Sequence, residues 1–348
     1  MKMKICEKCA VNPAANHIGI CGDCLRALGD DLDVRKVHIP VRKSYNLPIN
    51  PPKNTEGKRC TFCSNMCQIL DGESGFCGVR VNENGHLQNK APKGTALAYM
   101  YYDPLPSNCC AAWFCEGSKK AGQNLAVFFY GCNFDCLFCQ NSSHKLISKA
   151  SVITEDDMVS AALNPTVRCI CFFGGSPEPQ LPFSLRVAER VLKESPDNKH
   201  ICWECNGCGN SKLVATAAAL AAESKGTIKF DLKAFSSPIV RTLCGVDNRQ
   251  SFDNFTTIAK RFMGKKILTA TTLLVPYYVN EYEVEKIAHF IADINPSIPY
   301  SILIFHPDFY MRDLPITPKK QVYGCYEAAK KYLDNVNIGN RHLLGYAM

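Results

Sequence analysis

Hydrophobic and polar positions along the chain change their pattern near residue 124. From there to about residue 340, short runs rich in β-branched and aromatic residues alternate with segments whose apolar residues recur at helical spacing. This alternation is typical of repeated βα units around a parallel sheet. We therefore predict six strands, each followed by a helix, at residues 125–130, 169–173, 200–204, 227–232, 267–275 and 300–305.

Two of the predicted helices carry further signals. After the second strand, Leu185, Ala188 and Leu192 fall on one helical face, with Arg186 and its polar neighbours opposite. The last helix is predicted to begin with Thr317 as its N-cap and a proline at its first position. Six units are fewer than the eight of a closed barrel, so we predict an α/β fold with a partial, open TIM-like (βα)6 barrel over residues 124–340.

The first 123 residues lack this alternation and are divided by their cysteines. We predict a zinc-ribbon-like module at 1–37, a linker rich in Pro, Asn and Lys at 38–57, and a second cysteine-rich module with a connecting segment at 58–123. Residues 341–348 are predicted to be a C-terminal tail.

Composition narrows the class of protein. No apolar run in the 348 residues approaches the ~20 that a membrane helix needs, and the first residues lack the apolar core of a secretory signal. We therefore expect a cytoplasmic protein. In a reducing compartment its 21 cysteines would serve as metal ligands or as small buried hydrophobes. The net charge of +8 gives only weak support for nucleic acid as a partner.

A C-x3-C-x2-C loop made by Cys132, Cys136 and Cys139 directly follows the first predicted strand. Thiolates select iron-sulfur clusters, zinc or copper(I). A 4Fe-4S cluster held by three cysteines leaves one iron open to a small molecule. The alternative is a structural zinc ion whose fourth ligand, such as His144, lies outside the loop.

At these residues the sequence resembles the radical S-adenosylmethionine (radical SAM) superfamily, in which this spacing holds a 4Fe-4S cluster. The resemblance implies that S-adenosylmethionine chelates the open iron and that Phe138, which precedes the last cysteine, packs near its adenine. One electron from the cluster would break a carbon-sulfur bond of the sulfonium and give methionine and a 5′-deoxyadenosyl radical. The protein would tune the cluster and shield the radical.

The ends of later strands support the same resemblance. The second strand leads into Gly174, Gly175, Ser176, Pro177 and Glu178, which are similar to the Gly-Gly-Glu-Pro element that holds the amino group of the cofactor. Ser176 stands where that element has Glu. Either backbone carbonyls suffice at this position, or Glu178 takes over.

The third, fourth and sixth strands also end in residues with counterparts in the relatives. The resemblance implies cofactor contacts for Glu204 and Asn206, for Asp231 and Lys233, and for His306. Taken singly, Asp231 and Lys233 could be a surface ion pair and His306 a buried structural histidine. Their order along successive strands favours the functional interpretation.

The resemblance continues upstream and covers about residues 58–340. It is to uncharacterised relatives of pyruvate formate-lyase activating enzyme. Those relatives have a short linking segment where this chain has an insertion with three additional cysteines, Cys109, Cys110 and Cys115, whose role the resemblance does not explain.

Two further sets of cysteines precede the barrel. Cys6, Cys9, Cys21 and Cys24 form two C-x2-C knuckles, which predict tetrahedral zinc and leave open whether the module binds nucleic acid, binds protein or only folds a terminus. A second quartet fits zinc or an auxiliary iron-sulfur cluster, and we favour the cluster. Its members are Cys60, Cys63, Cys67 and Cys77.

Three functions compete. The first is a radical SAM enzyme that abstracts hydrogen from a protein or peptide, as activating enzymes of glycyl radical enzymes do, with a low-potential electron donor of the flavodoxin or ferredoxin type. The second keeps the radical but modifies RNA or a small metabolite. The third is a non-catalytic zinc-ribbon binding protein on a degenerate barrel, against which the intact loop cysteines argue.

Overall fold

The computed structural model describes residues 3–29, 34–109, 111–195 and 199–345. Its described part contains a nine-stranded sheet in the order β15-β14-β13-β12-β11-β10-β8-β7-β9. All six predicted strands are present and run parallel to one another. They are β8 (Gln123–Phe129), β10 (Val167–Gly174), β11 (His200–Cys205), β12 (Ile228–Asp231), β13 (Leu268–Leu274) and β14 (Tyr300–Ile304).

Three strands of this sheet were not predicted. β15 (Val336–Gly339) pairs in parallel with β14, while β7 (Thr95–Pro104) runs antiparallel to both β8 and β9 (Val152–Thr154). β15 is short and half-buried, so its residues show no apolar alternation. Because β15 and β9 form separate edges, the sheet stays open, and the prediction of a partial barrel is confirmed.

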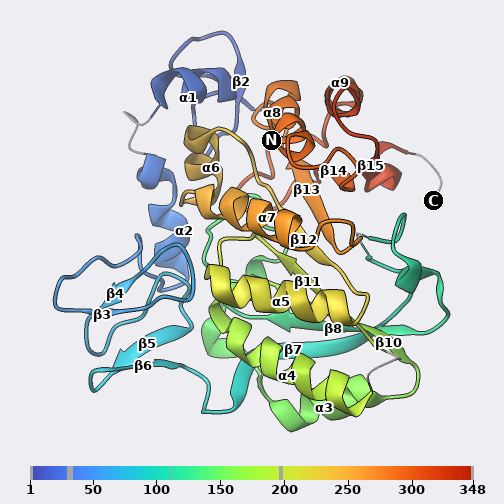
Figure 1. The fold of residues 1–348 in the computed structure, drawn as a ribbon. Helices are drawn as coiled ribbons and strands as arrows, with labels where there is room; N and C mark the ends of the chain where they lie inside the picture. The colour runs from blue at the N-terminus through green and yellow to red at the C-terminus, as the bar shows by residue number, and fades with distance from the viewer. Residues whose placement is uncertain (1–2, 30–33, 110, 196–198, 346–348) are drawn as a thin grey trace.

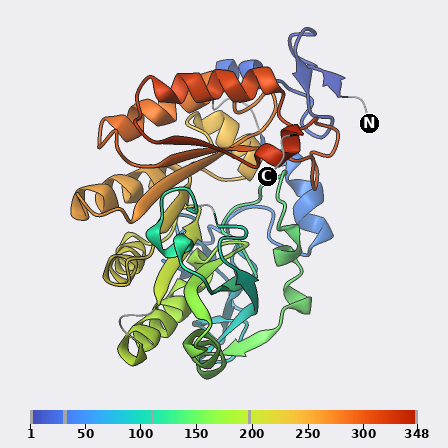
Figure 2. The same ribbon diagram turned by 90° about the vertical axis from the view of Figure 1, so that its right-hand side faces the viewer.

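Helices cover the outer face of the sheet, as Figures 1 and 2 show. The alternate side chains that point to this face, such as Ile170, Phe172 and Trp203, are almost fully buried and form the core with the helices. The covering helices are α3 (Glu155–Leu163), α4 (Leu181–Glu194), α5 (Ser211–Glu223), α6 (Ser237–Cys244), α7 (Arg249–Arg261), α8 (Glu281–Ala292) and α9 (Lys319–Lys330).

The predicted start of α9 was wrong by one position. The helix begins at Lys319, with Pro318 and not Thr317 as its N-cap. The hydroxyl of Thr317 is buried, donates to the carbonyl of Leu274 at 2.8 Å and accepts from the backbone N–H of Phe305 at 2.8 Å. Because the hydroxyl is already bonded to the ends of two strands, it does not cap the helix.

The N-terminal third forms small elements packed on the barrel. They are β1 (Lys4–Ile5), β2 (Pro13–Ala14), α1 (Gly22–Leu28), α2 (Ile39–Ser44), β3 (Lys58–Arg59), β4 (Gln68–Ile69), β5 (Arg80–Glu83) and β6 (His86–Asn89). Single 3-10 turns complete the fold at Val34–Val37, Glu116–Lys119, Ser142–Lys145, Ile147–Lys149, Glu178–Gln180 and Arg341–Leu344. None of the helices in the described ranges combines the length and apolar character that a bilayer crossing requires.

Part of the predicted linker is ordered. Within 38–57, α2 packs against the barrel, and His38 and Arg42 are buried. Their polar side chains bind buried partners, so a search for apolar periodicity misses this packing. Residues 30–33 of the predicted first module and 346–348 of the predicted tail lie outside the described residues. The predicted domain boundaries stay predictions.

Candidate cofactor pocket at the carboxyl ends of the strands

A pocket lies where the loop after β8 meets the carboxyl ends of β10 to β14. This is the end of a parallel barrel at which loops carry reactive groups. Of the residues singled out from the sequence, Cys132, Cys136, Phe138, Cys139, Gly174, Gly175, Ser176, Glu204, Asn206, Asp231 and Lys233 line it. Pro177, Glu178 and His306 do not. His306 is exposed.

The cysteine loop turns at Gly131, whose φ is +81°. A Cβ there would lie 2.9 Å from the carbonyl of Cys77 and 2.6 Å from Val79 Cγ1, so only glycine fits. Burial raises the pKa of Cys132 and that of Cys139, the latter to about 11. A hydrogen bond with the buried thiol of Cys244, which the sequence did not single out, lowers the pKa of Cys136.

The loop cysteines are not spaced as the ligands of a single zinc ion are. The sulfurs of a tetrahedral zinc site lie about 3.8 Å apart, because each Zn–S bond is about 2.3 Å. Within the described residues, neither the three loop cysteines nor any set of them with His144 comes this close together. His144 instead packs beside Gly175, and burial lowers the pKa of its ring well below the usual value.

Glu178 is turned away from the pocket. Its carboxylate accepts from the backbone N–H of Gly207 at 2.8 Å and contacts the hydroxyl of Ser176. Asn206 Nδ2 donates to the same hydroxyl at 2.8 Å. Burial raises the pKa of Glu178. Ser176 therefore faces the pocket with a hydroxyl positioned by two neighbours, while Glu178 supports the turn from behind.

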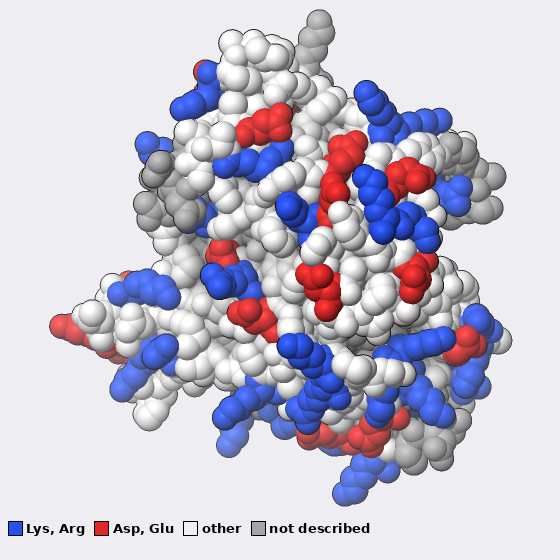
Figure 3. Space-filling model, turned by 45° about the horizontal axis from the view of Figure 1, so that its top comes forward, with Lys and Arg blue, Asp and Glu red and all other residues white. Residues whose placement is uncertain are grey.

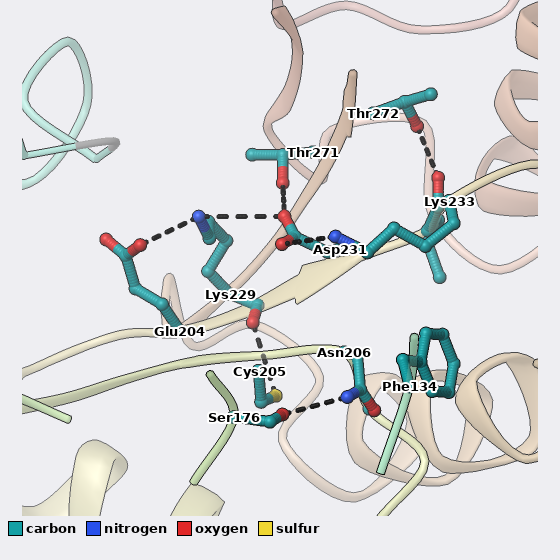
Figure 4. Close-up of polar contacts among 12 residues, drawn as sticks. Phe134, Ser176, Glu204, Cys205, Asn206, Lys229, Asp231, Lys233, Thr271 and Thr272 are labelled. Atoms are coloured by element: carbon teal, nitrogen blue, oxygen red, sulfur yellow. Dashed lines mark hydrogen bonds and ion pairs between the residues drawn. The ribbon is translucent and has the colours of Figure 1, made fainter. Parts of the chain in front are cut away.

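Charged side chains from β11 and β12 form the polar wall of the pocket, as Figure 4 shows. Lys229 Nζ lies 2.8 Å from Glu204 and 3.6 Å from Asp231, and Lys233 Nζ lies 3.0 Å from Asp231. Thr271 donates to Asp231 as well. Burial opposes ionisation of Asp231, but Lys229 and Lys233 outweigh it and lower the pKa of its carboxyl.

The sequence reasoning missed Lys229. The sequence signal that could have identified Lys229 was the alternation of side chains along β12. Lys229 and Asp231 are two residues apart, so they share one face of the strand. Lys233 also lies 5.9 Å from the ring centroid of Phe138, which joins the polar wall to the aromatic side chain of the cysteine loop.

A buried charge cluster supports the cysteine loop from behind. Asp135 accepts from His38 Nδ1 at 2.8 Å, lies 3.4 Å from Arg42 Nη1 and contacts Lys145 Nζ. His38 Nε2 is 2.9 Å from the carbonyl of Thr242. Two of these partners come from residues far away in the sequence, so no local pattern could have indicated them.

The first cysteine quartet is arranged for one metal ion. The sulfurs of Cys6, Cys9, Cys21 and Cys24 all lie within 4.8 Å of one another, and those of Cys9 and Cys21 are 3.9 Å apart. This matches the spacing of about 3.8 Å that tetrahedral zinc requires. The module docks on the barrel through Tyr278, whose hydroxyl accepts from Ala15 N–H and donates to the carbonyl of Ile20, both at 2.9 Å.

The second quartet sits directly on the cysteine loop. Asn65 Nδ2 donates to the carbonyl of Asn133 at 2.8 Å, and Ser64 N–H donates to that of Cys208 at 2.9 Å. Burial raises the pKa of Cys63 and Cys67, with neighbouring thiolates of the quartet adding to it. In contrast to the first quartet, no three of these sulfurs lie within 4.8 Å of one another.

The chain is similar to several known proteins. The chain is 25% identical over 293 residues to an uncharacterized protein of Methanocaldococcus jannaschii, with 81% of each chain covered. It is 25% identical over 254 residues to the isethionate sulfite-lyase activating enzyme of Desulfovibrio desulfuricans, covering 71% of this chain and 74% of that one.

Among solved structures, a domain of a pyruvate-formate lyase-activating enzyme from Bacteroides vulgatus superposes with a TM-score of 0.40 and 18% identity, covering 49% of this chain and 98% of the other. The family model of the radical SAM superfamily matches residues 126–291, which begin in β8 and end in α8. Residues 126–291 of this chain therefore match a radical SAM domain.

Proposed function

We propose that the protein cleaves S-adenosylmethionine reductively and uses the resulting radical to abstract hydrogen from a protein or peptide. The single observation that carries this proposal is the pocket. Three thiols, a pair of glycines and a charged wall converge there from the ends of four strands, β8, β10, β11 and β12.

The donor set fits a 4Fe-4S cluster. Cys132, Cys136 and Cys139 line one pocket without the close sulfur spacing of a single-ion site, as expected of ligands that bind separate irons. The cluster, when bound, supplies the electron that splits the sulfonium. Six further residues that line the pocket are proposed to contact S-adenosylmethionine: Phe138, Gly174, Gly175, Ser176, Glu204 and Asn206.

The chain's own side chains would then position the cofactor. Gly174 and Gly175 leave room for backbone groups to approach its amino group, and the hydroxyl of Ser176 adds a polar contact. Asp231 offers acceptor oxygens and Lys233 donor protons to the polar end of the cofactor, while Phe138 offers an aromatic face. His306, Pro177 and Glu178 lie outside the lining, and their expected contacts with the cofactor stay predictions.

For the upstream modules we propose zinc at Cys6, Cys9, Cys21 and Cys24, where the sulfur spacing supports a single ion. At Cys60, Cys63, Cys67 and Cys77 we propose an auxiliary iron-sulfur cluster. The wider spacing of these sulfurs supports a cluster, and the bond from Asn65 of the same module to Asn133 of the catalytic loop supports a relay of electrons from a flavodoxin or ferredoxin.

A protein or peptide substrate is supported by the likeness to an activating enzyme. The alternative of RNA gains no support from the face in Figure 3, where Lys and Arg side chains are interspersed with Asp and Glu. The third hypothesis, a non-catalytic binding protein, is disfavoured because the thiols of the cysteine loop share one pocket with the other cofactor residues.

The test is anaerobic reconstitution with iron and sulfide, followed by S-adenosylmethionine and dithionite. We expect a brown protein that releases 5′-deoxyadenosine, and at least a 100-fold lower rate for Cys136→Ala. Cys325→Ala is the control, because it removes a buried thiol that lies in α9 and outside the pocket lining. A colourless wild-type protein that contains zinc only, or undiminished cleavage by Cys136→Ala, would contradict the proposal.

The substrate class is tested with deuterium. The active enzyme is incubated separately with deuterated protein, RNA and small-molecule fractions of a cell extract, and 5′-deoxyadenosine is analysed by mass spectrometry. We expect label from the protein fraction. Label from the RNA or the small-molecule fraction alone would replace the proposed substrate class.

A further inference from the structure

A group of cysteines faces the interior of the barrel, away from the three sets described so far. Cys171 of β10 pairs with Cys202 of β11, and Cys169 lies two residues before Cys171 on the same face. In phase with them are Phe173 and Glu204, which line the cofactor pocket. The sulfurs of β10 and β11 therefore point into the interior, nearer to the amino ends of the strands.

The insertion between β7 and β8 covers this amino end. It spans residues 105–122, of which residue 110 lies outside the described residues, and Figure 2 shows it in teal in front of the sheet. Trp113 Nε1 donates to the hydroxyl of Ser301 on β14 at 3.0 Å. Gly117 lies against His200 at the start of β11, since a Cβ there would be 2.9 Å from the ring. The insertion is thus fixed at two strands.

This placement brings the cysteines of the insertion to those of the strands. Burial raises the pKa of Cys169, and the thiols of Cys115 and Cys109 raise it further. The pKa of Cys202 is likewise raised by burial and then by Cys169 and Cys115. The pKa of Cys109 is in turn raised by burial, and the thiol of Cys202 and the carboxylate of Glu204 raise it further. Together with the strand pairing and the docked insertion, these effects place the four sulfurs in one partly buried region next to the polar wall of the pocket.

We propose that Cys109, Cys115, Cys169 and Cys202 hold an iron-sulfur cluster inside the barrel. Four thiols from a loop and two strands are the donor set that such clusters take. Zinc is disfavoured because, among the described residues, no three of these sulfurs lie within 4.8 Å of one another. The cluster would lie near Glu204, which lines the cofactor pocket.

The test compares the metal content of full-length variants after anaerobic reconstitution. Iron, sulfide and zinc per chain are measured, together with the Mössbauer and electron paramagnetic resonance spectra. The probe variant is Cys109→Ser/Cys115→Ser, which changes only the insertion and leaves the strands intact. Cys325→Ser is the matched control for loss of a buried thiol. Circular dichroism and the melting temperature verify that each protein is folded.

We expect the double variant to lose one cluster's complement of iron and sulfide, while Cys325→Ser retains the wild-type content. Cys202→Ala, which alters a strand ligand, should lose the same spectral component. Unchanged iron and sulfide in the folded double variant would overturn the proposal, as would a selective loss of zinc. A disulfide between Cys109 and Cys202 in protein isolated anaerobically, found by mass spectrometry, would also overturn it.

This inference stands apart from the proposed function. A variant with all three loop cysteines, Cys132, Cys136 and Cys139, changed to Ala should lose S-adenosylmethionine cleavage but keep the spectrum of the interior cluster. If that variant contains no interior component while the wild type cleaves the cofactor, the interior site fails and the proposed function survives.

Discussion

Asp135 joins the cysteine loop to a group of buried basic side chains. It lies between two loop cysteines, is fully buried, and contacts His38, Arg42 and Lys145. Removing one member of a buried ionic group leaves the others without compensation for their lost hydration. The loop geometry therefore depends on a carboxylate that takes no part in the proposed chemistry.

We predict that Asp135→Asn lowers the free energy of unfolding of the iron-free protein by about 3 to 5 kcal/mol, the cost typical of breaking a buried ion pair. Urea denaturation at pH 7 measures this difference. Asp253→Asn, which alters an exposed carboxylate on α7, serves as the control and should change it by less than about 0.5 kcal/mol. Equal stabilities of the two variants would show that the cluster does not hold the loop.

Asp231 should make stability depend on acid pH. The neighbouring lysines lower the pKa of its carboxyl in the folded protein, while the unfolded value is about 3.9. A lowered folded pKa stabilises the protein above the unfolded pKa, and this contribution disappears as the pH falls towards the folded value. The carboxylate is thus expected to support Lys229 and Lys233 throughout the neutral range.

We predict that Asp231→Asn destabilises the iron-free protein by about 1.5 to 3 kcal/mol from pH 5 to pH 8, the range for hydrogen bonds to charged groups. Below about pH 4 the difference from wild type should shrink, because the wild-type carboxylate then becomes protonated as the chain unfolds. Denaturation curves between pH 3 and pH 8 measure this. A difference that stays constant down to pH 3 would contradict the assignment of the shift to Asp231.

At the scale of elements, the first module cannot fold on its own hydrophobic core. β1 and β2 have two residues each and α1 has seven, and the residues packed together inside the module are mainly its cysteines. Metal binding in such modules is linked to folding. Contact with the barrel further stabilises the module. It is made through Tyr278 and through the ion pair of Arg26 with Glu283 at 3.2 Å.

We predict that Cys24→Ser removes one zinc ion per chain and unfolds the module locally, since the free energy of structural zinc binding, about 10 to 16 kcal/mol in zinc-finger peptides, is lost from its folding. Hydrogen exchange should then rise over residues 3–29 and stay low in α4, which serves as the internal reference. Tyr278→Phe should loosen docking but keep the zinc. Unchanged protection of residues 3–29 in Cys24→Ser would argue against a metal-dependent fold.

At the scale of the whole molecule, the pocket is shared by the loop after β8 and by strands across most of the open sheet. A ligand that contacts so many elements links parts of the barrel that are far apart in the sequence. Binding to the folded state alone stabilises it by an amount set by the ligand concentration relative to the Kd.

We predict that S-adenosylmethionine at about 100 times its Kd stabilises the reconstituted protein by about 2.7 kcal/mol and raises its Tm by a few degrees. Anaerobic calorimetry measures the shift. Cys136→Ala, which is expected to lack the catalytic cluster, should show a much smaller one. An equal shift in both proteins would mean that the cofactor binds without the cluster.

The sequence by itself determined the parts of this protein that depend on local periodicity and spacing. Six strands, their parallel arrangement and the open barrel follow from alternating β and α patterns, because each pattern is a property of neighbouring residues. The cysteine loop and most of the pocket lining follow from their positions just after strands, since parallel strands bring their carboxyl ends together.

The tertiary structure alone decided which side chains those positions place in the pocket. Glu178 is drawn to Gly207 and Thr317 to two strand ends, because buried polar groups bind the nearest available partners wherever these lie in the sequence. His38 reaches Asp135 from a segment without any apolar pattern, and Trp113 of the insertion reaches Ser301 on β14. Such contacts depend on packing between distant segments, which a one-dimensional pattern does not encode.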